Sequence, residues 1–325
     1  MPRQTRGFAP TDVPLLSWFA AAAITIGLCA AISFAWSRIP AHSGPWRAAA
    51  ARYRQNRVAM AALYFIIALC VITILAPWLA PYSPSAQPDI VGLKSRPPSS
   101  QYLFGTDQYS RDVFSRVLYG ARISLPVALL AILVSITVGT SYGAIAGFVG
   151  GRLDAAMMRC IDAALSIPRI LLLIGVLALW GGVPLPVLIL MLGLTGWFGV
   201  SRLVRAQVMA IRENDMVVAA RALGGRQRRI LMRHILPNVL APVIVAATLG
   251  IGNVIIVEAG LSYLGIGVRP PTASWGNIIQ DGSDQIAALW WISAFPGLAI
   301  VLTVMAVNLV GDGLRDALDP RQLPG

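Results

Sequence analysis

Charged residues are scarce in this sequence, which argues against an ordinary soluble globular protein. Only 12% of its 325 residues are Asp, Glu, Lys or Arg, whereas soluble domains carry roughly 25%. Five stretches contain no charged residue, and a sixth is interrupted only by His234: residues 13–37, 58–88, 123–151, 170–201, 285–311 and 234–257. Each stretch can supply the ~20 apolar residues with which a helix crosses a bilayer.

The apolar stretches also lack the strict alternation that is typical of membrane β-barrels. Since only helices and closed barrels satisfy their backbone in lipid, we predict an all-α, polytopic membrane helix bundle. The stretch 170–201 contains the breaker cluster Gly181–Pro186 and is therefore divided in two. The expected spans are residues 13–37, 58–80, 123–146, 162–181, 185–206, 237–257 and 287–310, which amount to six core helices and an extra N-terminal helix.

Motifs of catalysis, metal binding and nucleotide binding are missing. The sequence has no HExxH, GxSxG or GxxxxGK[ST] pattern, so we expect no enzyme and no ATP site on this chain. Cys29, Cys70 and Cys160 form no CxxC pair, which predicts free thiols and no metal site. An ion-coupled secondary transporter stays open as an alternative, although paired inverted repeats and mid-membrane ionisable residues other than Arg169 are absent.

Positive charge is concentrated between particular spans. Eight of the 26 Lys and Arg residues lie between Arg202 and Arg233, and five lie between Arg38 and Arg57. Basic loops stay on the cytoplasmic side of a membrane. Both segments are therefore expected on the cytoplasmic side of a bacterial plasma (inner) membrane, which the chain crosses several times. The net charge of +12 therefore indicates contact with membrane lipid and not with nucleic acid.

We divide the chain into four regions. Residues 1–51 hold the extra helix, either retained with its N-terminus outside or removed by a later start codon, and a basic linker. Residues 52–120 hold the first core helix and an external loop, whose second half from Thr106 is expected along the membrane surface. Residues 121–318 form the core transmembrane domain with an inner loop at 207–236, and 319–325 form a cytoplasmic tail. In the external loop, Arg111 and Arg116 can pair with Asp107 and Asp112.

The inner loop is predicted to form two short helices hinged at Gly224-Gly225, because glycine permits the positive φ of a sharp turn. Ala219 and Ala220 provide a smooth face for a partner. Apolar anchors for a partner's groove are also present, namely Leu223, Ile230, Leu231 and Ile235. The alternative is a basic loop bound to anionic headgroups.

This segment resembles the EAA loop of the permeases of ATP-binding-cassette (ABC) importers. The matching residues are Ala219, Ala220, Gly224, Leu236 and Pro237, whereas Val218 stands where that family usually has Glu. Four further segments resemble the C-type permeases of dipeptide and oligopeptide importers: residues 56–84, 104–125, 192–208 and 258–279. The resemblance covers residues 52–318.

The resemblance implies the type I ABC importer fold and a permease that forms half of a path for dipeptides or oligopeptides, with nickel, glutathione or another small solute as alternatives. It implies four partners: a second, homologous permease in a heterodimer, two ATP-binding subunits that hold ATP and Mg, and an extracytoplasmic solute-binding protein. The coupling residues it implies are Val218, Ala219, Ala220, Arg221, Leu223, Gly224, Gly225, Arg228 and Pro237.

Three residues are candidates for the translocation path or for contact with the binding protein. Asn253 and Glu258 are expected at the outer end of the fifth core span, where Glu258 could instead hydrogen-bond the helix end. Arg169 either snorkels toward the inner surface, which is the preferred expectation, or faces a polar cavity. Asp281 and Asp284 are expected to be solvated loop charges.

Overall fold

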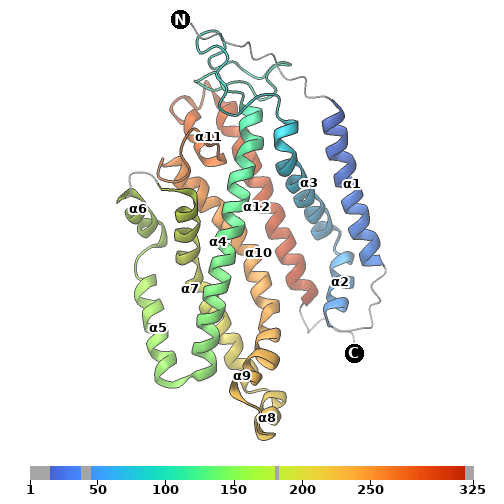
Figure 1. Ribbon diagram of the computed structural model, residues 1–325, viewed down its shortest axis with the longest axis vertical. Coiled ribbons are helices and arrows are strands. Elements are labelled where there is room, and N and C mark those ends of the chain that lie inside the picture. Colours follow the sequence, from blue (N-terminus) through green and yellow to red (C-terminus); the bar gives the residue numbers. More distant parts are fainter. Residues whose placement is uncertain (1–14, 38–44, 180–182, 319–325) are drawn as a thin grey trace, which may run out of the picture.

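The computed structural model describes residues 15–37, 45–179 and 183–318, and within these ranges it contains helices and no strand (Figure 1). The helices are α1 (Leu15–Ser37), α2 (Pro45–Gln55), α3 (Arg57–Leu79), α4 (Val113–Val149), α5 (Gly151–Leu165), α6 (Arg169–Leu179), α7 (Leu185–Arg212), α8 (Asp215–Ala222), α9 (Gln227–Ile230), a π-helical turn (Leu231–Ile235), α10 (Leu236–Tyr263), α11 (Trp275–Gly282), a 3-10 turn (Ser283–Gln285) and α12 (Trp290–Leu318). The all-α prediction is confirmed. The predicted tail 319–325, part of the basic linker and the Gly181-Gly182 turn lie outside the described residues.

Five helices are long and apolar enough to cross a membrane: α3, α4, α7, the continuous helix Gln227–Tyr263, and α12. Helices α5 and α6 form a pair bent by 72°, which makes a sixth span if the pair is counted as one. Helix α1 exists as predicted and begins at the same end of the bundle as the loop between α3 and α4 (Figure 1). That α1 crosses the membrane stays a prediction.

The predicted third core span at 162–181 is wrong. Helix α5 ends at Leu165, and α6 starts at Arg169 in a different direction. Pro168 lies at this break, and a proline disfavours helical geometry in the residue before it. The break places Arg169 in the first turn of α6.

Two other predicted boundaries are also wrong. Helix α4 begins at Val113 and not at residue 123, because the Asp112 carboxylate accepts a hydrogen bond of 2.8 Å from the Ser115 amide and caps the helix. It runs through residue 120, and Thr106–Arg122 is thus no separate surface helix. The fifth core span starts at Gln227 and ends at Tyr263. Pro237 is accommodated inside it because the preceding turn is π-helical, with the Leu236 amide bonded to the Leu231 carbonyl.

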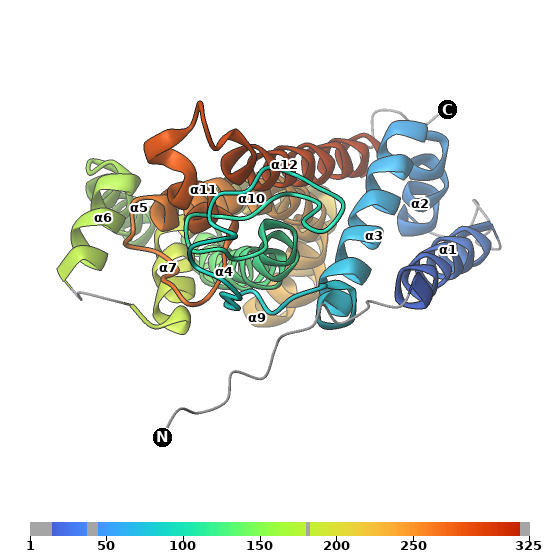
Figure 2. The same cartoon turned by 90° about the horizontal axis from the view of Figure 1, so that it is seen from above.

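Helices α4 and α7 pack against each other along a glycine seam, defined here as Gly139, Gly143 and Gly147. A Cβ atom on Gly143 would overlap the Ser201 carbonyl oxygen and lie 2.9 Å from the Val204 Cβ. Small residues four apart let helix backbones approach closely in lipid, where van der Waals packing drives association. Figure 2 shows α5 and α6 at one edge of the bundle and α1 and α2 at the other, with α4 and α10 between them.

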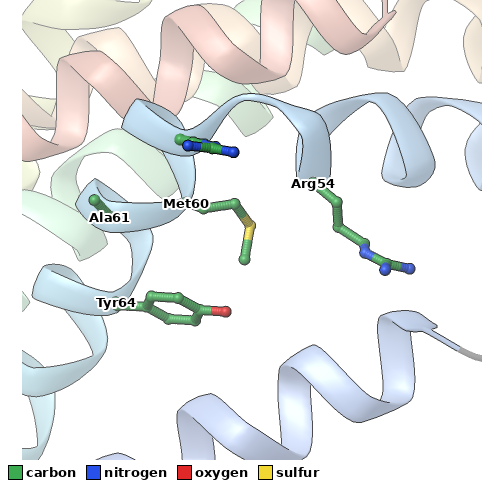
Figure 3. A pocket seen from close by; sticks show the side chains of 5 residues that line it. Arg54, Met60, Ala61 and Tyr64 are labelled. Atoms are coloured by element: carbon green, nitrogen blue, oxygen red, sulfur yellow. The ribbon is translucent and has the colours of Figure 1, made fainter.

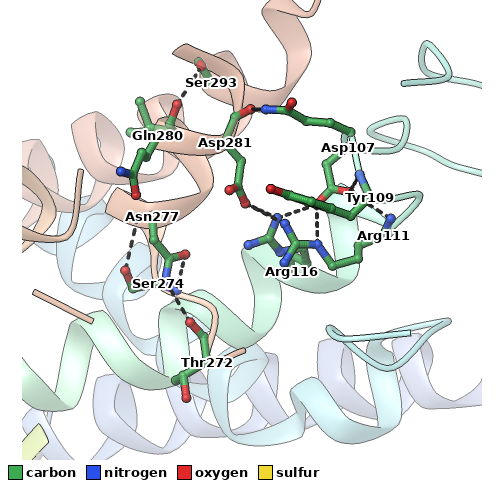
Figure 4. A network of polar contacts seen from close by, with 12 residues as sticks. Asp107, Tyr109, Arg111, Arg116, Thr272, Ser274, Asn277, Gln280, Asp281 and Ser293 are labelled. Atoms are coloured by element: carbon green, nitrogen blue, oxygen red, sulfur yellow. Dashed lines mark hydrogen bonds and ion pairs between the residues drawn. The ribbon is translucent and has the colours of Figure 1, made fainter. Parts of the chain in front are cut away.

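The outer end of the bundle is held by a buried network of four charges (Figure 4). Arg111 and Arg116 both bond Asp107 Oδ2, at 2.6 and 2.5 Å, and both bond Asp281 Oδ2, at 2.7 and 2.6 Å. Asp281 belongs to α11, so the network joins the external loop and the start of α4 to the distant helix α11. The predicted pairing of the arginines with Asp107 is confirmed, whereas Asp112 caps α4 instead.

Asp281 was expected in solvent, and that prediction is wrong. Its side chain is only 14% exposed, and its backbone carbonyl also accepts a hydrogen bond from the Gln108 side chain. Nearby, the Trp291 indole donates to the Thr106 carbonyl at 3.1 Å. The external loop is therefore hydrogen-bonded to both α11 and α12, and polar contacts hold the helices together at this end of the bundle.

The glycine seam predicts that Gly143→Ala lowers the stability of the fold by about 2 kcal/mol, because the added methyl overpacks a close helix contact. The matched control is Gly175→Ala in α6, where a Cβ would meet no atom within 4 Å. Thermal unfolding of the two purified variants in detergent measures the difference. Equal melting temperatures would show that the seam is not closely packed.

The charge network predicts that Asp281→Ala destabilises the protein by on the order of 3 kcal/mol, since two buried arginines then share one carboxylate. The control is Asp284→Ala, three residues away and exposed. The melting temperature of each variant is the measurement. A similar small shift in both variants would contradict the network's role.

Candidate functional site

The predicted inner loop forms a pair of short helices, α8 and α9, that projects from the end of the bundle opposite α11 and the external loop (Figure 1). The turn between them is built by Gly224, whose φ is +78°, and by hydrogen bonds of 3.0 Å from the Gly224 amide to the Arg221 carbonyl and from the Gly225 amide to the Ala220 carbonyl. A Cβ on Gly225 would lie 2.6 Å from the Ala220 carbonyl oxygen. The predicted glycine hinge is confirmed.

The helix pair is attached to the bundle by its own apolar residues. Val217, Ile230 and Ile235 are buried in one cluster with Val204 and Val208 of α7. The prediction that Ile230 and Ile235 serve as anchors for a partner is therefore wrong, because these side chains face the chain's own core. Leu231 is half-buried in the same cluster. The pair is thus packed against both α7 and α10.

The outward surface of the pair keeps the other predicted coupling residues. Leu223 is 88% exposed and Val218 is 51% exposed. Arg221, Arg228 and Ala219 are exposed, whereas Ala220 and Gly225 are half-buried. We call Val218–Arg228 the inner tip. Pro237 is exposed but belongs to α10, outside this tip.

Ion pairs and hydrogen bonds fix the inner half of α7 to its neighbours. The Arg205 guanidinium bonds both Asp154 oxygens on α5, at 2.5 and 2.6 Å. Arg212 donates to the carbonyls of Gly147 and Phe148 at 3.4 and 3.3 Å. The inner half of α7 is thus bonded to both α4 and α5.

A second feature is a cavity of about 210 Å³ in the middle of the bundle, which we call the central cavity. It brings Arg169 and Asn253 together, two of the three predicted path residues. Residues from α4, α6, α7 and α10 line it: Ile132, Ser135, Arg169, Gly196, Gly199, Val200, Leu203, Ala246, Gly250, Asn253 and Val254.

Arg169 does not snorkel to the inner surface. Its Nε donates to Thr195 Oγ1 at 3.1 Å and its Nη2 to the Leu192 carbonyl at 2.9 Å, both well inside α7. The structure thus supports the second expectation, a charge that faces a polar cavity. The Arg169 side chain is only partly buried, because one side of its guanidinium faces the central cavity.

Glu258, the third predicted path residue, does not line the central cavity. It lies within α10 and is completely buried, and its Oε1 accepts a hydrogen bond of 2.7 Å from Ser262 on the same helix. This bond lies in the last turns of α10, which ends at Tyr263, and it supports the alternative expectation that Glu258 forms a hydrogen bond at the helix end. The exposed Asn253, five residues earlier on the same helix, lines the central cavity together with Arg169.

Two polar residues of the central cavity region were missed at the sequence level. Ser135 lines the cavity, and Thr195 orients Arg169. The available signal was a hydroxyl inside an otherwise apolar run. That signal is weak, because such hydroxyls commonly bond the carbonyl four residues earlier, as Thr195 also does with Met191 at 2.9 Å.

Two further cavities lie toward the inner end. One, of about 480 Å³, shares Leu203 and Ala246 with the central cavity and reaches Arg315 of α12. The other, of about 390 Å³, lies at the junction of α2 and α3 and is lined by Arg54, Arg57, Met60, Ala61 and Tyr64 (Figure 3). Its basic and apolar lining is compatible with the predicted headgroup contact, which stays a prediction.

Within the described ranges no group of three or more His, Cys, Asp and Glu residues could hold a metal ion. Cys29, Cys70 and Cys160 are free cysteines. Outside the membrane spans, burial raises the pKa of the Asp112 carboxyl, although the bonds from Ser115 oppose this shift. In the described part of the chain, the inner tip and the central cavity are the functional candidates.

Comparison with known proteins matches two families to consecutive parts of the chain. Residues 44–98 match the N-terminal transmembrane domain of oligopeptide transport permease C. Residues 139–323 match the inner membrane component of binding-protein-dependent transport systems.

Curated relatives cover most of the chain. The dipeptide transport system permease protein DppC of Bacillus subtilis (strain 168) is 41% identical over 85% of this chain and 84% of its own length. A putative peptide transport system permease protein of Brucella abortus is 42% identical over 83% of this chain and 89% of its own length. The oligopeptide transport system permease protein OppC of Bacillus subtilis (strain 168) is 38% identical over 85% and 90%. The chain therefore belongs to the family of inner membrane components of binding-protein-dependent transport systems, a family of multi-pass permeases.

Proposed function

We propose that this chain is one permease subunit of an ATP-driven ABC importer for peptides. The observation that carries the proposal is the inner tip, a glycine-hinged helix pair with an exposed leucine beyond the membrane spans. The names of the relatives support peptides as cargo, since they describe dipeptide, peptide and oligopeptide permeases. None of these three relatives is named for nickel or glutathione, so their names favour peptides over those alternatives.

In this proposal the chain works with four partner proteins. A homologous permease completes the path as a heterodimer, and an extracytoplasmic binding protein delivers the peptide. Two ATP-binding subunits dock at the inner end and hold ATP and Mg, because this sequence has no phosphate-binding loop of its own. The chain itself would bind no cofactor and catalyse no reaction.

The inner tip acts as a coupling lever in this proposal. Closure of the ATP-binding subunits would push on Val218–Arg228, and the buried contacts of Val217, Ile230 and Ile235 would carry the push into α7 and α10. Rigid-body movement of these helices alternates access to the path between the two sides. The glycine hinge keeps α8 and α9 at a fixed angle, so little of the motion is lost in the turn.

Val218 modifies the docking chemistry. Where relatives of this type usually carry a carboxylate, this chain presents an exposed apolar side chain. An ion pair from this position to the ATP-binding subunit is therefore not available. Leu223 supplies the apolar contact, and the exposed Arg221 and Arg228 supply charge.

The lever predicts that Leu223→Asp abolishes docking without unfolding the protein, because the side chain is 88% exposed. Loss of a central apolar anchor costs 2 kcal/mol or more, roughly thirtyfold in affinity. Co-purification of the ATP-binding subunits measures this loss. The control is Val91→Asp, an equally exposed apolar residue of the external loop, and retention of the subunits by both variants would refute the docking assignment.

The hinge predicts that Gly224→Val uncouples ATP hydrolysis from uptake, since valine strongly disfavours a φ of +78°. Peptide uptake should fall at least tenfold while ATP hydrolysis by the assembled complex persists. Both rates are measured in proteoliposomes. Normal uptake by this variant would remove the lever from the mechanism.

The function as a whole is tested by uptake of a labelled dipeptide into liposomes that hold the assembled transporter. Uptake should require ATP, the ATP-binding subunits and the binding protein. Undiminished uptake without the ATP-binding subunits, driven by an ion gradient, would instead support a secondary transporter.

A further inference from the structure

Arg169 is a membrane-embedded cation without a carboxylate partner in the described part of the chain. The ion pairs found there involve other arginines, at the outer network, on α5–α7 and at the end of α7. The two bonds that Arg169 makes go to a neutral hydroxyl and a carbonyl. A charge at this depth is costly, and neutral dipoles offset only part of that cost. The uncompensated charge of Arg169 therefore favours binding of an anion beside its guanidinium.

The surroundings keep the guanidinium accessible. Ser135 and Gly196 form the adjacent wall, and a Cβ on Gly196 would lie 3.3 Å from Arg169 Nη2 and 2.5 Å from Ser135 Oγ. Glycine at this position thus leaves the room that Arg169 occupies. Gly199, on the same helix, has open space where its Cβ would be. The packing exposes one side of the guanidinium to the cavity.

The central cavity adjoins a second cavity that lies toward the inner end of the bundle. Leu203 and Ala246 line both the central cavity and the inner cavity that reaches Arg315. A solute leaving Arg169 would therefore pass between α7 and α10, the two helices that carry the inner tip. Both helices would move with the lever described above.

We propose that Arg169 binds the carboxylate of the peptide cargo during its passage, an inference that rests on the proposed function. Guanidinium and carboxylate form charge-assisted, often paired, hydrogen bonds. Every unmodified peptide carries a terminal carboxylate, which is ionised at neutral pH because its pKa is roughly 3.5. A single arginine can thus recognise the group that peptides of different sequence share. Asn253, on the facing helix α10, offers an amide that can bond the peptide backbone.

The test compares two cargoes in the assembled transporter: a labelled dipeptide and the same dipeptide with an amidated C-terminus. The quantity measured is the ratio of their ATP-dependent uptake rates. The binding protein is identical in every assay, so its own preference cancels when the ratio of a variant is divided by that of the wild type.

Arg169→Gln should lower uptake of the carboxylate form at least tenfold. A tenfold change corresponds to the loss of about one hydrogen bond to a charged group. Uptake of the amide should change less than twofold, and Arg169→Lys should give an intermediate ratio. Asn253→Asp should act in the same direction, because it places a competing carboxylate in the same cavity at an exposed position. The matched control is Arg159→Gln, an exposed arginine of α5 that should leave the ratio unchanged.

Equal loss of both cargoes in Arg169→Gln and Asn253→Asp would overturn the proposal, and would point to an acidic residue of the second permease as the partner of Arg169. An unchanged ratio in both variants would also overturn it, while ATP-dependent uptake by the wild type would leave the proposed function standing. If Arg169→Gln does not assemble, the ratio in Asn253→Asp decides alone. Absence of any ATP-dependent peptide uptake by the wild type would instead defeat the proposed function.

Discussion

Close packing of α4 on α7 along the glycine seam is the contact on which the rest of the structure depends. Because residues 139, 143 and 147 are glycines, the backbones of α4 and α7 are in contact. Other helices pack against this pair. Helix α5 is tied to it through Arg205 and Asp154. The central cavity is formed where α6 and α10 approach the middle of the pair. A larger residue in the seam would shift both functional regions.

Polar contacts close the bundle at its outer end and stiffen it at the inner end. Outside, Asp107 and Asp281 compensate Arg111 and Arg116 within a buried network. Inside, the bonds of Arg212 hold the end of α7 to α4. Apolar packing alone carries little directional information in lipid, so these polar contacts set the helix ends.

Much of the fold was predictable because its causes are local. A helix in lipid must bond its own backbone, so charge-free runs predict most spans, and the glycine pair at Gly224-Gly225 predicts a turn for steric reasons. Boundaries were less predictable. The start of α4 at Val113 depends on the cap by Asp112, and the π-helical turn before Pro237 lets one helix run where two segments were expected.

By itself, the sequence determined a polytopic helical membrane protein with a glycine-hinged helix pair between its fourth and fifth core spans, because hydropathy and glycine geometry act over short distances. Only the tertiary structure decided which side chains meet. Asp281 pairs with residues 165 and 170 positions away, and Arg169 reaches α7 and a cavity instead of the membrane surface. Such pairings depend on how helices pack across the bundle, and no local pattern records that packing.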